Sequence, residues 1–500
     1  MLMLHAIVAG IWLLLWYAVY STTRKESIPT VRCWPSLVPK FLDRLSYNKQ
    51  AVRLVKHGYE KYKNRPFRLL KMDMDLIVIP LQYAFELRAI TSDKLDPLTA
   101  SFDDNAGKVT RILLGSELHT RAIQRRLTPR LSQTLPIILD ELSHAFEKIL
   151  PTIDGPNTWI PVNPYELVLN LSTRAAARLF VGEPICRDEH FLETSASYSR
   201  NTFDTISTSR SLGHLVTYFL GRWIYTVDEA HGQLQYIQNL LGSEIRRRKD
   251  HPEDKRDDFL QWCMDLARTE DEAQPEALAH RTLGILSMAV VHTTAMATTH
   301  LLFDMSSDDD LKASLRQEQE NVLKQGWTEI TQQVMLDMKQ LDSLMRESQR
   351  VNPVGEFTFR RIVREPITLS DGYQLKPGQQ IALPAKCINT DNRILPDAEL
   401  FEPLRWTKQA GAAPTSFSNS SASNLHFGLG RYACPGRFIA SYMIKAITSR
   451  ILLEYDFKLH DEFASERPPN IIHGDKILPN RTAVILLRRR DDKVSNVERR

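Results

Sequence analysis

One cysteine of the chain lies in a setting that favours chemistry. Cys434 belongs to residues 427–437, FGLGRYACPGR, with glycines before and after it and an arginine on each side. Gly430 and Gly436 allow the backbone to turn tightly, and Pro435 suits the first turn of a helix. A helix N-terminus and neighbouring arginines both favour the thiolate form of a cysteine. A thiolate presented on such a loop is a suitable axial ligand for a haem iron.

A second candidate lies on a long stretch with few charges, residues 276–303. This stretch is apolar nearly all round, which predicts a helix that crosses the core. Thr293 is on a face of small side chains that can lie against a flat macrocycle, although a helix-packing face is the alternative. The neighbouring His292 is a candidate proton relay, because its unperturbed pKa is near neutral, or equally a structural histidine. The residues that recur every four positions are Ile285, Ala289, Thr293 and Ala297.

A third constellation combines a helix with a later loop. Glu347 and Arg350 are three positions apart within residues 328–351, which are predicted to be helical, so they share one face. Arg405 follows in residues 401–406, FEPLRW. Taken alone, the helical pair indicates no more than an exposed ion pair of little energetic value.

Together these stretches resemble the cytochrome P-450 family. Residues 427–437 match all four fixed positions of its haem-binding loop, F-x-x-G-x-x-x-C-x-G. Residues 401–406 are similar to its F-x-P-x-R-W loop, and residues 289–294, AVVHTT, are similar to a variant found in fungal terpenoid-modifying members. The resemblance implies that Cys434 is the axial iron ligand. The implied haem-binding residues are Phe427, Gly430, Arg431, Tyr432, Cys434 and Gly436.

The resemblance also implies roles for residues outside the cysteine loop. Thr293 matches the alcohol that delivers protons during oxygen activation, and His292 replaces the usual acid. The implied structural network joins Glu347, Arg350 and Arg405. The implied substrate-pocket residues are Ala289, Val290, Val354 and Phe357, with Phe102, Val109 and Ile112 as weaker candidates.

Two departures from the family affect how the haem carboxylates are held. Tyr432 stands where Arg or His is usual, so it offers a hydrogen bond without a charge. The family's Trp-x-x-x-Arg pair is absent, because its two places carry Thr120 and Gln124. The candidates to replace its arginine are Arg121, Arg125 and Arg126, and a solvated basic face is the alternative.

The composition of the whole chain limits the classes of protein to which it can belong. Of its 500 residues, 43% are hydrophobic and 25% are charged, which are globular values. A net charge of +4 is too small to indicate nucleic acid, but it suits an anionic membrane or an acidic partner. The five cysteines are far apart and odd in number, so neither a disulfide framework nor a zinc site is predicted.

For the elements that must position these residues, the resemblance implies a mainly α fold with small β-sheets. The expected structure is the cytochrome P-450 fold, preceded by an N-terminal transmembrane helix. The apolar run 3–20 precedes Arg24 and Lys25, which predicts an anchor in residues 1–21 with the domain of residues 22–500 in the cytosol. A cleaved signal peptide is the alternative. The pattern further predicts helices over 132–270, loops at 95–115 and 409–424, and strands at 357–363 and 379–384.

The predicted function is a haem-thiolate monooxygenase of the endoplasmic reticulum membrane. Its substrate is expected to be a bulky lipophilic terpenoid, meroterpenoid or indole-diterpene intermediate of fungal secondary metabolism. Electrons would come from NADPH through a reductase, with cytochrome b5 as a second candidate partner. Arg431, Arg437 and Lys445 are candidates for a basic docking surface. The alternatives are a haem-containing isomerase or dehydratase without oxygen activation, and a membrane-tethered binding protein without catalysis.

Overall fold

A computed structural model describes residues 28–110, 112, 115–150, 158–324, 326–408, 415–463 and 466–490. The predicted anchor in residues 1–21 lies outside the described residues. Within them, one helical stretch, Pro275–Ser306, is long and apolar enough to cross a membrane by length and composition. Because 72% of its most apolar window is buried inside the protein, this stretch is the predicted central helix of the core.

Helices form most of the described structure. In the first half of the chain they are α2 (Lys40–Lys61), α3 (Leu81–Leu87), α4 (Pro97–Asp104), α5 (Gly107–Thr110), α6 (Leu118–Ala122), α7 (Leu131–Ile149), α8 (Pro164–Phe180), α9 (Glu189–Leu212), α10 (His214–Leu220) and α11 (Tyr225–Asp250). In the second half they are α12 (Phe259–Leu266), α13 (Glu270–Ala273), α14 (Pro275–Gly284), α15 (His292–Ser306), α16 (Asp309–Val322), α17 (Gln332–Asp337), α18 (Lys339–Val351), α19 (Ala385–Asn389), α20 (Arg405–Lys408) and α21 (Arg437–Glu454).

Within the described residues, the strands form four small sheets. The six-stranded sheet has the order β1 (Thr30–Val31), β2 (Phe67–Leu70), β3 (Asp75–Val78), β9 (Gln380–Leu383), β6 (Thr358–Val363) and β4 (Leu95–Asp96). The three-stranded sheet has the order β10 (Tyr455–Leu459), β13 (Ile485–Arg489) and β5 (Ile160–Val162). The two hairpins are β7 (Ile367–Thr368) with β8 (Gln374–Leu375), and β11 (Ile471–His473) with β12 (Lys476–Leu478).

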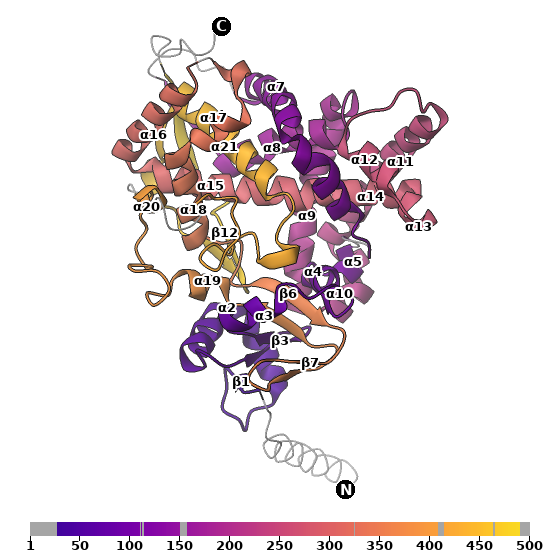
Figure 1. Ribbon diagram of the computed structural model, residues 1–500, viewed down its shortest axis with the longest axis vertical. Helices are drawn as coiled ribbons and strands as arrows, with labels where there is room; N and C mark the ends of the chain where they lie inside the picture. The colour runs from indigo at the N-terminus through magenta and orange to yellow at the C-terminus, as the bar shows by residue number, and fades with distance from the viewer. Residues whose placement is uncertain are drawn as a thin grey trace.

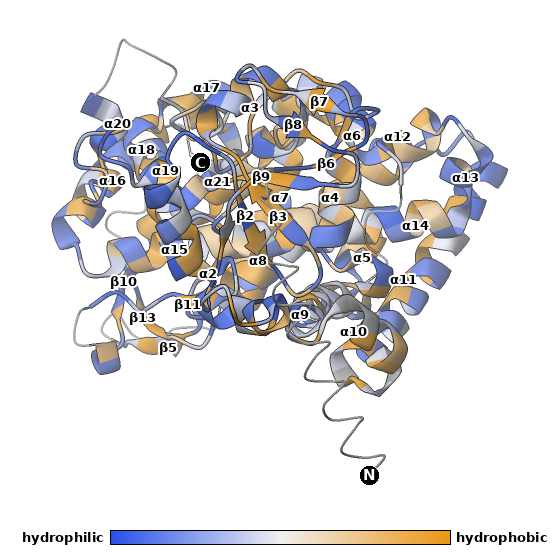
Figure 2. Ribbon diagram, turned by 90° about the horizontal axis from the view of Figure 1, so that it is seen from below, coloured by the Kyte–Doolittle hydropathy of each residue, from blue (hydrophilic) through white to orange (hydrophobic). Residues whose placement is uncertain are grey.

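The elements are divided between a helical mass and a smaller region around the six-stranded sheet. In Figure 1 the sheet, with α2 and α3, occupies the lower part of the molecule, and most of the helices lie above it. Figure 2 shows hydrophobic segments of α8, β3 and β9 inside the fold and hydrophilic ones on peripheral helices such as α13. A mainly helical fold with small sheets is confirmed.

The central helix contains a π-helical turn. Pro275 begins α14, Ile285–Val291 is π-helical, and α15 continues directly to Ser306. Such a turn shifts the helical register, because its hydrogen bonds span five residues instead of four. The face predicted from four-residue spacing is therefore only partly correct: Ile285 is buried, whereas the side chain of Ala289 is accessible.

Two segments predicted as loops have defined structure. Residues 97–110 form α4 and α5, because the Asp96 carboxylate accepts the amide hydrogens of Leu98 and Thr99 and Pro97 begins α4. After residues 409–414, which lie outside the described part, Phe417 is buried and the Asn424 side chain donates to three backbone carbonyls. The prediction of a loop was wrong for residues 97–104 and 107–110, whereas residues 415–424 are a loop that these side-chain bonds hold in place.

Candidate functional site

The loop that carries Cys434 is held by its own backbone. The Cys434 amide donates to the carbonyl of Phe427 at 2.8 Å, and a short 3₁₀ turn, Gly430–Tyr432, lies between them. Gly428 and Gly430 have φ values of 78° and 77°, in the left-handed region that favours glycine. The Arg437 guanidinium closes the turn by donating to the Cys434 carbonyl at 2.9 Å. The cysteine therefore lies directly before α21, as predicted.

The end of α3 clamps this loop at Gly430. A Cβ atom on Gly430 would lie 2.5 Å from Cβ and 2.7 Å from the carbonyl oxygen of Arg88. The same carbonyl accepts the Arg431 amide hydrogen at 3.1 Å. At Gly436 the protein leaves more room, because an added Cβ would lie 4.0 Å from the Cys434 sulphur. Glycine at 430 is thus required by the protein, whereas glycine at 436 leaves space beside the sulphur.

The electrostatics around the sulphur suit a metal-bound thiolate. Burial raises the pKa of the Cys434 thiol, while the amides of Gly436 and Arg437 and the charge of Arg437 oppose that rise. Burial prevails in the protein alone, although the start of the helix and Arg437 act in the predicted direction and favour the thiolate. A bound cation deprotonates a coordinating thiol outright. The two amides directed at the sulphur therefore fit a ligand whose charge is completed by a metal.

The middle of the central helix presents small accessible side chains and one hydroxyl. The Thr293 hydroxyl donates to the carbonyl of Ala289 at 2.6 Å, directly after the π-helical turn. Ala289 is exposed, and Val290 and Thr293 are partly exposed, although this helix is otherwise largely buried. Single π-helical turns occur frequently at functional sites. The helix thus offers an accessible face that combines small apolar groups with the Thr293 hydroxyl.

His292 lies on the other side of the helix. Its side chain is only 2% exposed, and its Nδ1 lies 3.1 Å from the hydroxyl of Tyr165 on α8. The ring packs 4.5 Å from that of Phe203 on α9. Burial, with Arg481 and Lys476 nearby, lowers the pKa of His292 to about 3, so the ring is neutral at physiological pH. These contacts favour the structural histidine over the proton relay.

The three predicted members of the structural network are brought together in the structure. Glu347 is 0% exposed and accepts from Arg350 Nε and Nη2 at 2.9 and 2.7 Å. Arg405 Nε donates to the same carboxylate at 3.2 Å. The Trp406 indole and the Glu402 amide also donate to the Glu347 carboxylate, at 3.1 and 3.0 Å. The network joins α18 to the loop that leads into α20.

Sequence analysis missed a buried arginine beside the cysteine loop. Arg361 on β6 is 5% exposed, and its guanidinium lies 4.2 Å from the Phe359 ring and 5.4 Å from the Tyr432 ring. Its Nη1 donates to the Arg360 carbonyl at 2.7 Å, but no carboxylate of a described residue forms an ion pair with it. Burial consequently lowers the pKa of Arg361 to about 10. A buried cation of this kind suits a negatively charged ligand.

The predicted substitutes for the missing arginine lie in α6, for Arg121, and in the turn that follows it, for Arg125 and Arg126. Arg121 is committed elsewhere, because its guanidinium forms an ion pair with Glu272 at 2.6 Å. Arg125 is exposed and Arg126 is partly exposed, which agrees with a solvated basic face.

Lys445, predicted to belong to a docking surface, is 2% exposed and pairs with Asp342 at 2.7 Å. That prediction is wrong, because Lys445 faces into the protein from α21.

The predicted pocket residues come from several elements. Val290 and Val354 are partly buried against the same large apolar cluster as Phe427 of the cysteine loop. Phe357 packs instead against the smaller cluster beneath the six-stranded sheet. Of the weaker candidates, Ile112 packs near Gly284 of α14, since a Cβ there would lie 3.7 Å from the Ile112 side chain. Val290, Val354 and Phe427 therefore share one apolar cluster, which extends through most of the helical part of the protein.

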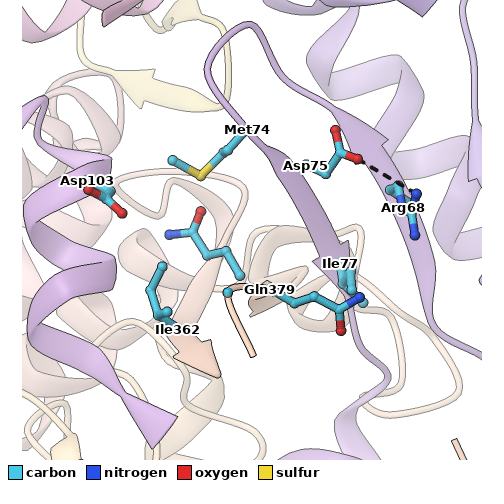
Figure 3. A pocket seen from close by; sticks show the side chains of 9 residues that line it. Arg68, Met74, Asp75, Ile77, Asp103, Ile362 and Gln379 are labelled. Atoms are coloured by element: carbon cyan, nitrogen blue, oxygen red, sulfur yellow. Dashed lines mark ion pairs between the residues drawn. The ribbon is translucent and has the colours of Figure 1, made fainter. Parts of the chain in front are cut away.

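A separate cavity of about 250 Å³ lies against the six-stranded sheet. Figure 3 shows its wall, with the Arg68–Asp75 ion pair at 3.7 Å on one side. None of the predicted site residues lines it. The full lining is Arg68, Met74, Asp75, Ile77, Asp103, Ile362, Gly378, Gln379 and Gln380.

The residues around Cys434 fit a haem. The sulphur receives two backbone amides, Gly436 leaves room beside it, and Arg361 supplies a buried charge without a carboxylate partner. These features suit an iron-containing macrocycle with acidic side chains. The comparisons with known proteins agree with this interpretation.

Residues 71–482 match the family Cytochrome P450. The chain is 79% identical to the cytochrome P450 monooxygenase ltmP of Epichloe festucae var. lolii, over 99% of this chain and all of that protein. It is 67% identical to idtP of Claviceps paspali over 99% of this chain and 100% of that protein, and 42% identical to paxP of Penicillium paxilli over 97% and 94%. The retinoic acid-bound cyanobacterial CYP120A1 shares the fold, with a TM-score of 0.69 at 16% identity over 92% of this chain and 99% of that one. The chain therefore belongs to the cytochrome P450 family and is a haem-thiolate monooxygenase that receives electrons from a redox partner.

Proposed function

We propose that this enzyme inserts one oxygen atom from O2 into a bulky lipophilic terpenoid of fungal secondary metabolism. An indole-diterpene intermediate is the narrowest form of this proposal. The observation that carries it is the accessible face of the central helix, where Ala289 and Val290 are apolar and Thr293 is the polar group. Pockets for lipophilic ligands combine apolar walls with few polar groups. The similarity to fungal monooxygenases over the whole chain supports the biological setting.

Several residues are proposed to hold the haem. Cys434 would ligate the iron, and Phe427 and Gly430 shape the loop that presents the sulphur. Arg361 and the Tyr432 hydroxyl would hold the acidic side chains of the macrocycle, with Arg431 as a second cation at the loop surface. When bound, the haem supplies the oxygen activation and transfer that amino-acid side chains cannot perform. The protein supplies binding, orientation and exclusion of water.

Thr293 is proposed to be the proton-donating residue. Its hydroxyl proton is held on the carbonyl of Ala289, and rotation about the side chain turns it into the accessible space beside the helix. His292 is assigned a positioning role, because its ring contacts Tyr165 and Phe203 on two neighbouring helices. In this interpretation His292 holds α15 against α8 and α9.

We also propose that the enzyme is a single-pass protein of the endoplasmic reticulum membrane, anchored by residues 1–21. Exposed apolar side chains support proximity to a membrane: Leu37 and Phe41 before and within α2, and Phe219 and Trp223 in and after α10. The electron donor would be an NADPH-dependent reductase, and cytochrome b5 is a second candidate. Arg431 is exposed and Arg437 partly exposed, so both remain available for docking.

The decisive test combines a spectrum with isotope labelling. Reduced, carbon monoxide-bound enzyme in membranes should show a strongly red-shifted Soret band that Cys434→Ala abolishes. Incubation of an indole-diterpene with NADPH, reductase and ¹⁸O₂ should then yield a product that contains one ¹⁸O atom.

Each result separates the proposal from its alternatives. Turnover without NADPH and O2 would identify an isomerase or dehydratase. A haem-thiolate spectrum without turnover of any lipophilic terpenoid would refute the proposed substrate class. The control variant Ala289→Phe should keep the carbon monoxide band but lose the spectral shift that the substrate induces, since Phe fills the accessible face.

A further inference from the structure

Arg346 on α18 is a buried cation whose charge no described carboxylate pairs with. It is 3% exposed, and its guanidinium lies 3.6 Å from the centre of the Trp406 ring. The carboxylates that act on its charge are those of Asp342 and Glu347. Both have other partners, because Asp342 pairs with Lys445 and Glu347 belongs to the structural network. Within the described residues, Arg346 therefore forms no ion pair of its own.

Most of the hydrogen-bonding capacity of Arg346 is unused. Its Nη2 donates to the Ser423 hydroxyl at 3.3 Å, whereas Nε and Nη1 are buried without a hydrogen-bond partner among the described residues. A guanidinium carries five N–H groups in a planar fork, which matches the oxygens of carboxylates and phosphates. Burial lowers the pKa of Arg346 to about 10, against the opposing effect of Asp342 and Glu347. An anion at this place would satisfy the free donors and offset the cost of burial.

Ser423 is the accessible end of this contact. The chain turns tightly over residues 421–424, where the Asn424 amide donates to the Ser421 carbonyl at 3.1 Å and the Ser421 amide donates to the Asn424 carbonyl at 3.2 Å. Ser423 is an exposed residue of this turn. Exposed tips of small polar residues are readily reached by proteases, and the same access serves a protein kinase. One hydroxyl thus faces solvent while it contacts a buried cation.

The turn belongs to a serine-rich segment, residues 415–424, TSFSNSSASN. The hydroxyls of Ser416 and Ser418 lie 3.1 Å apart, and that of Ser421 lies 3.3 Å from the Ser423 hydroxyl. Among the hydrogen bonds that these serines form with described residues, that of Ser423 is the one that involves an arginine. Its place in the fold, and not the local sequence, distinguishes Ser423 from its neighbours.

The serine-rich segment is attached to the cysteine loop. The Ser420 hydroxyl donates to the carbonyl of Gly428 at 2.5 Å. The Phe417 ring lies 4.6 Å from the His426 ring and 5.2 Å from the Phe427 ring. A contact that fixes this segment on α18 therefore also acts on the loop that presents the cysteine.

We propose that Ser423 is a phosphorylation site and that Arg346 receives the phosphate group. A protein kinase would transfer the γ-phosphoryl group of ATP: the Ser423 oxygen forms a bond to phosphorus, the bond to the β-phosphate oxygen breaks, ADP leaves, and the hydroxyl proton is released. Phosphoserine carries about 1.5 to 2 negative charges at neutral pH and three acceptor oxygens. Opposite an arginine, it forms charge-assisted hydrogen bonds that order a loop. The modification thus holds residues 415–428 on α18.

Phosphopeptide mapping tests whether Ser423 is modified. The full-length enzyme is isolated from its native cells in the presence of phosphatase inhibitors and digested with trypsin, which cleaves after Lys408 and Arg431. The peptide 409–431 should carry one phosphate, fragment ions should place it on Ser423, and phosphatase should remove it. A peptide without phosphate, or with its phosphate on another serine, would refute the proposal.

Titration of the phosphate tests whether Arg346 is its partner. Phosphoserine is introduced at position 423 of the full-length haem-loaded enzyme by codon suppression, and its second pKa is followed by ³¹P NMR. This pKa should fall from about 6 to about 5 or below, because a nearby opposite charge favours the charged form. The matched control carries phosphoserine at position 418, where the native hydroxyl contacts Ser416, and should keep a second pKa of about 6.

Substitutions of Arg346 identify the group that lowers the phosphate pKa. In the protein with phosphoserine at position 423, Arg346→Met should return the second pKa to about 6. Arg346→Lys should lower it less than the native arginine does, since an ammonium group is a point charge without the planar fork. The comparison of positions 423 and 418 leaves Arg346 intact, so it stands even if Arg346→Met does not fold. Equal pKa values at these two positions would refute the role of Arg346.

Hydrogen exchange distinguishes a covalent phosphate from a free one. Phosphoserine at position 423 should slow amide exchange in residues 416–428 by roughly tenfold or more and leave exchange in α9 unchanged. Unmodified enzyme in excess inorganic phosphate should show no slowing. Equal slowing by inorganic phosphate would identify a site for a free anion and overturn the assignment to phosphoserine. Unchanged exchange in the modified enzyme would refute the ordering of the segment.

Discussion

Glu347→Gln should destabilise the enzyme more than its conservative shape suggests. In the structure one carboxylate accepts from the side chains of Arg350, Arg405 and Trp406 and from the Glu402 amide. Burial alone would raise the pKa of Glu347, but the hydrogen bonds of Arg350 and the other donors outweigh it and lower that pKa. The carboxylate is therefore ionised at neutral pH, and the substitution removes its charge.

The size of the expected loss of stability follows from the burial of the arginines that contact Glu347. Arg350 and Arg405 are both buried, so after the substitution two guanidinium groups face an amide that carries an NH2 group of its own. Breaking a buried ion pair by removing one partner costs about 3–5 kcal/mol. Because the folded-state pKa of Glu347 is lowered, its contribution is complete above about pH 4.3, the value of a free glutamate, and is lost at lower pH.

Urea unfolding at pH 7, followed by tryptophan fluorescence and by loss of the carbon monoxide band, measures this cost. The matched control is Glu365→Gln, which removes the carboxylate of an exposed pair with Lys94 and should change stability by no more than about 0.5 kcal/mol. A loss below about 1 kcal/mol for Glu347→Gln, similar to that of the control, would refute the reasoning that this buried network holds the haem region together.

Three further predictions concern the site and its surroundings. Gly430→Ala should abolish haem incorporation, measured as Soret absorbance per protein, because its Cβ meets Arg88, whereas Gly372→Ala, at φ 87° in open space, should retain it. Arg361→Met should weaken haem retention during competition with apomyoglobin, and Arg361→Lys should restore part of it; equal retention in all three proteins would contradict the assignment. Stability should fall as the pH drops below about 6.5, because buried neutral histidines take up protons only on unfolding, and each should cost about 1.4 kcal/mol at pH 5.5 in urea titrations. The histidines whose pKa values are lowered to about 3 or 4 are His119, His292 and His426.

The parts of the site that sequence analysis predicted depend on short-range geometry. The cysteine loop is continuous in sequence, and Glu347 with Arg350 follows from helical periodicity. The π-helical turn was invisible to that periodicity, so the predicted face was shifted at Ile285. The prediction that Lys445 belongs to a docking surface was wrong for a related reason. Its helix α21 is apolar on several sides, and no pattern in the sequence marks the lysine as buried.

Sequence analysis could not predict the buried charges Asp104, Asp475, Arg210 and Arg361, because tertiary structure brings each of them to its partners. Asp104 and Asp475 are 371 positions apart, and their common partner Arg210 lies on a third element. Isolated charged residues are far more often solvated than buried, so each taken singly indicates a surface position. Only the fold shows that their charges compensate one another.

The two consecutive arginines of β6 face two different groups of side chains. Side chains alternate along a strand, so Arg360 faces Asp104 and Asp475 while Arg361 faces Tyr432 of the cysteine loop. Between Thr358 and Arg361 the strand carries one extra residue relative to β9, and Phe359 has φ 54°. Bulges re-aim side chains, and this bulge includes Arg360 and ends at Arg361. Asp104 and Asp475 hold this strand on one side through Arg360, and under the proposed role of Arg361 the haem carboxylates would hold it on the other.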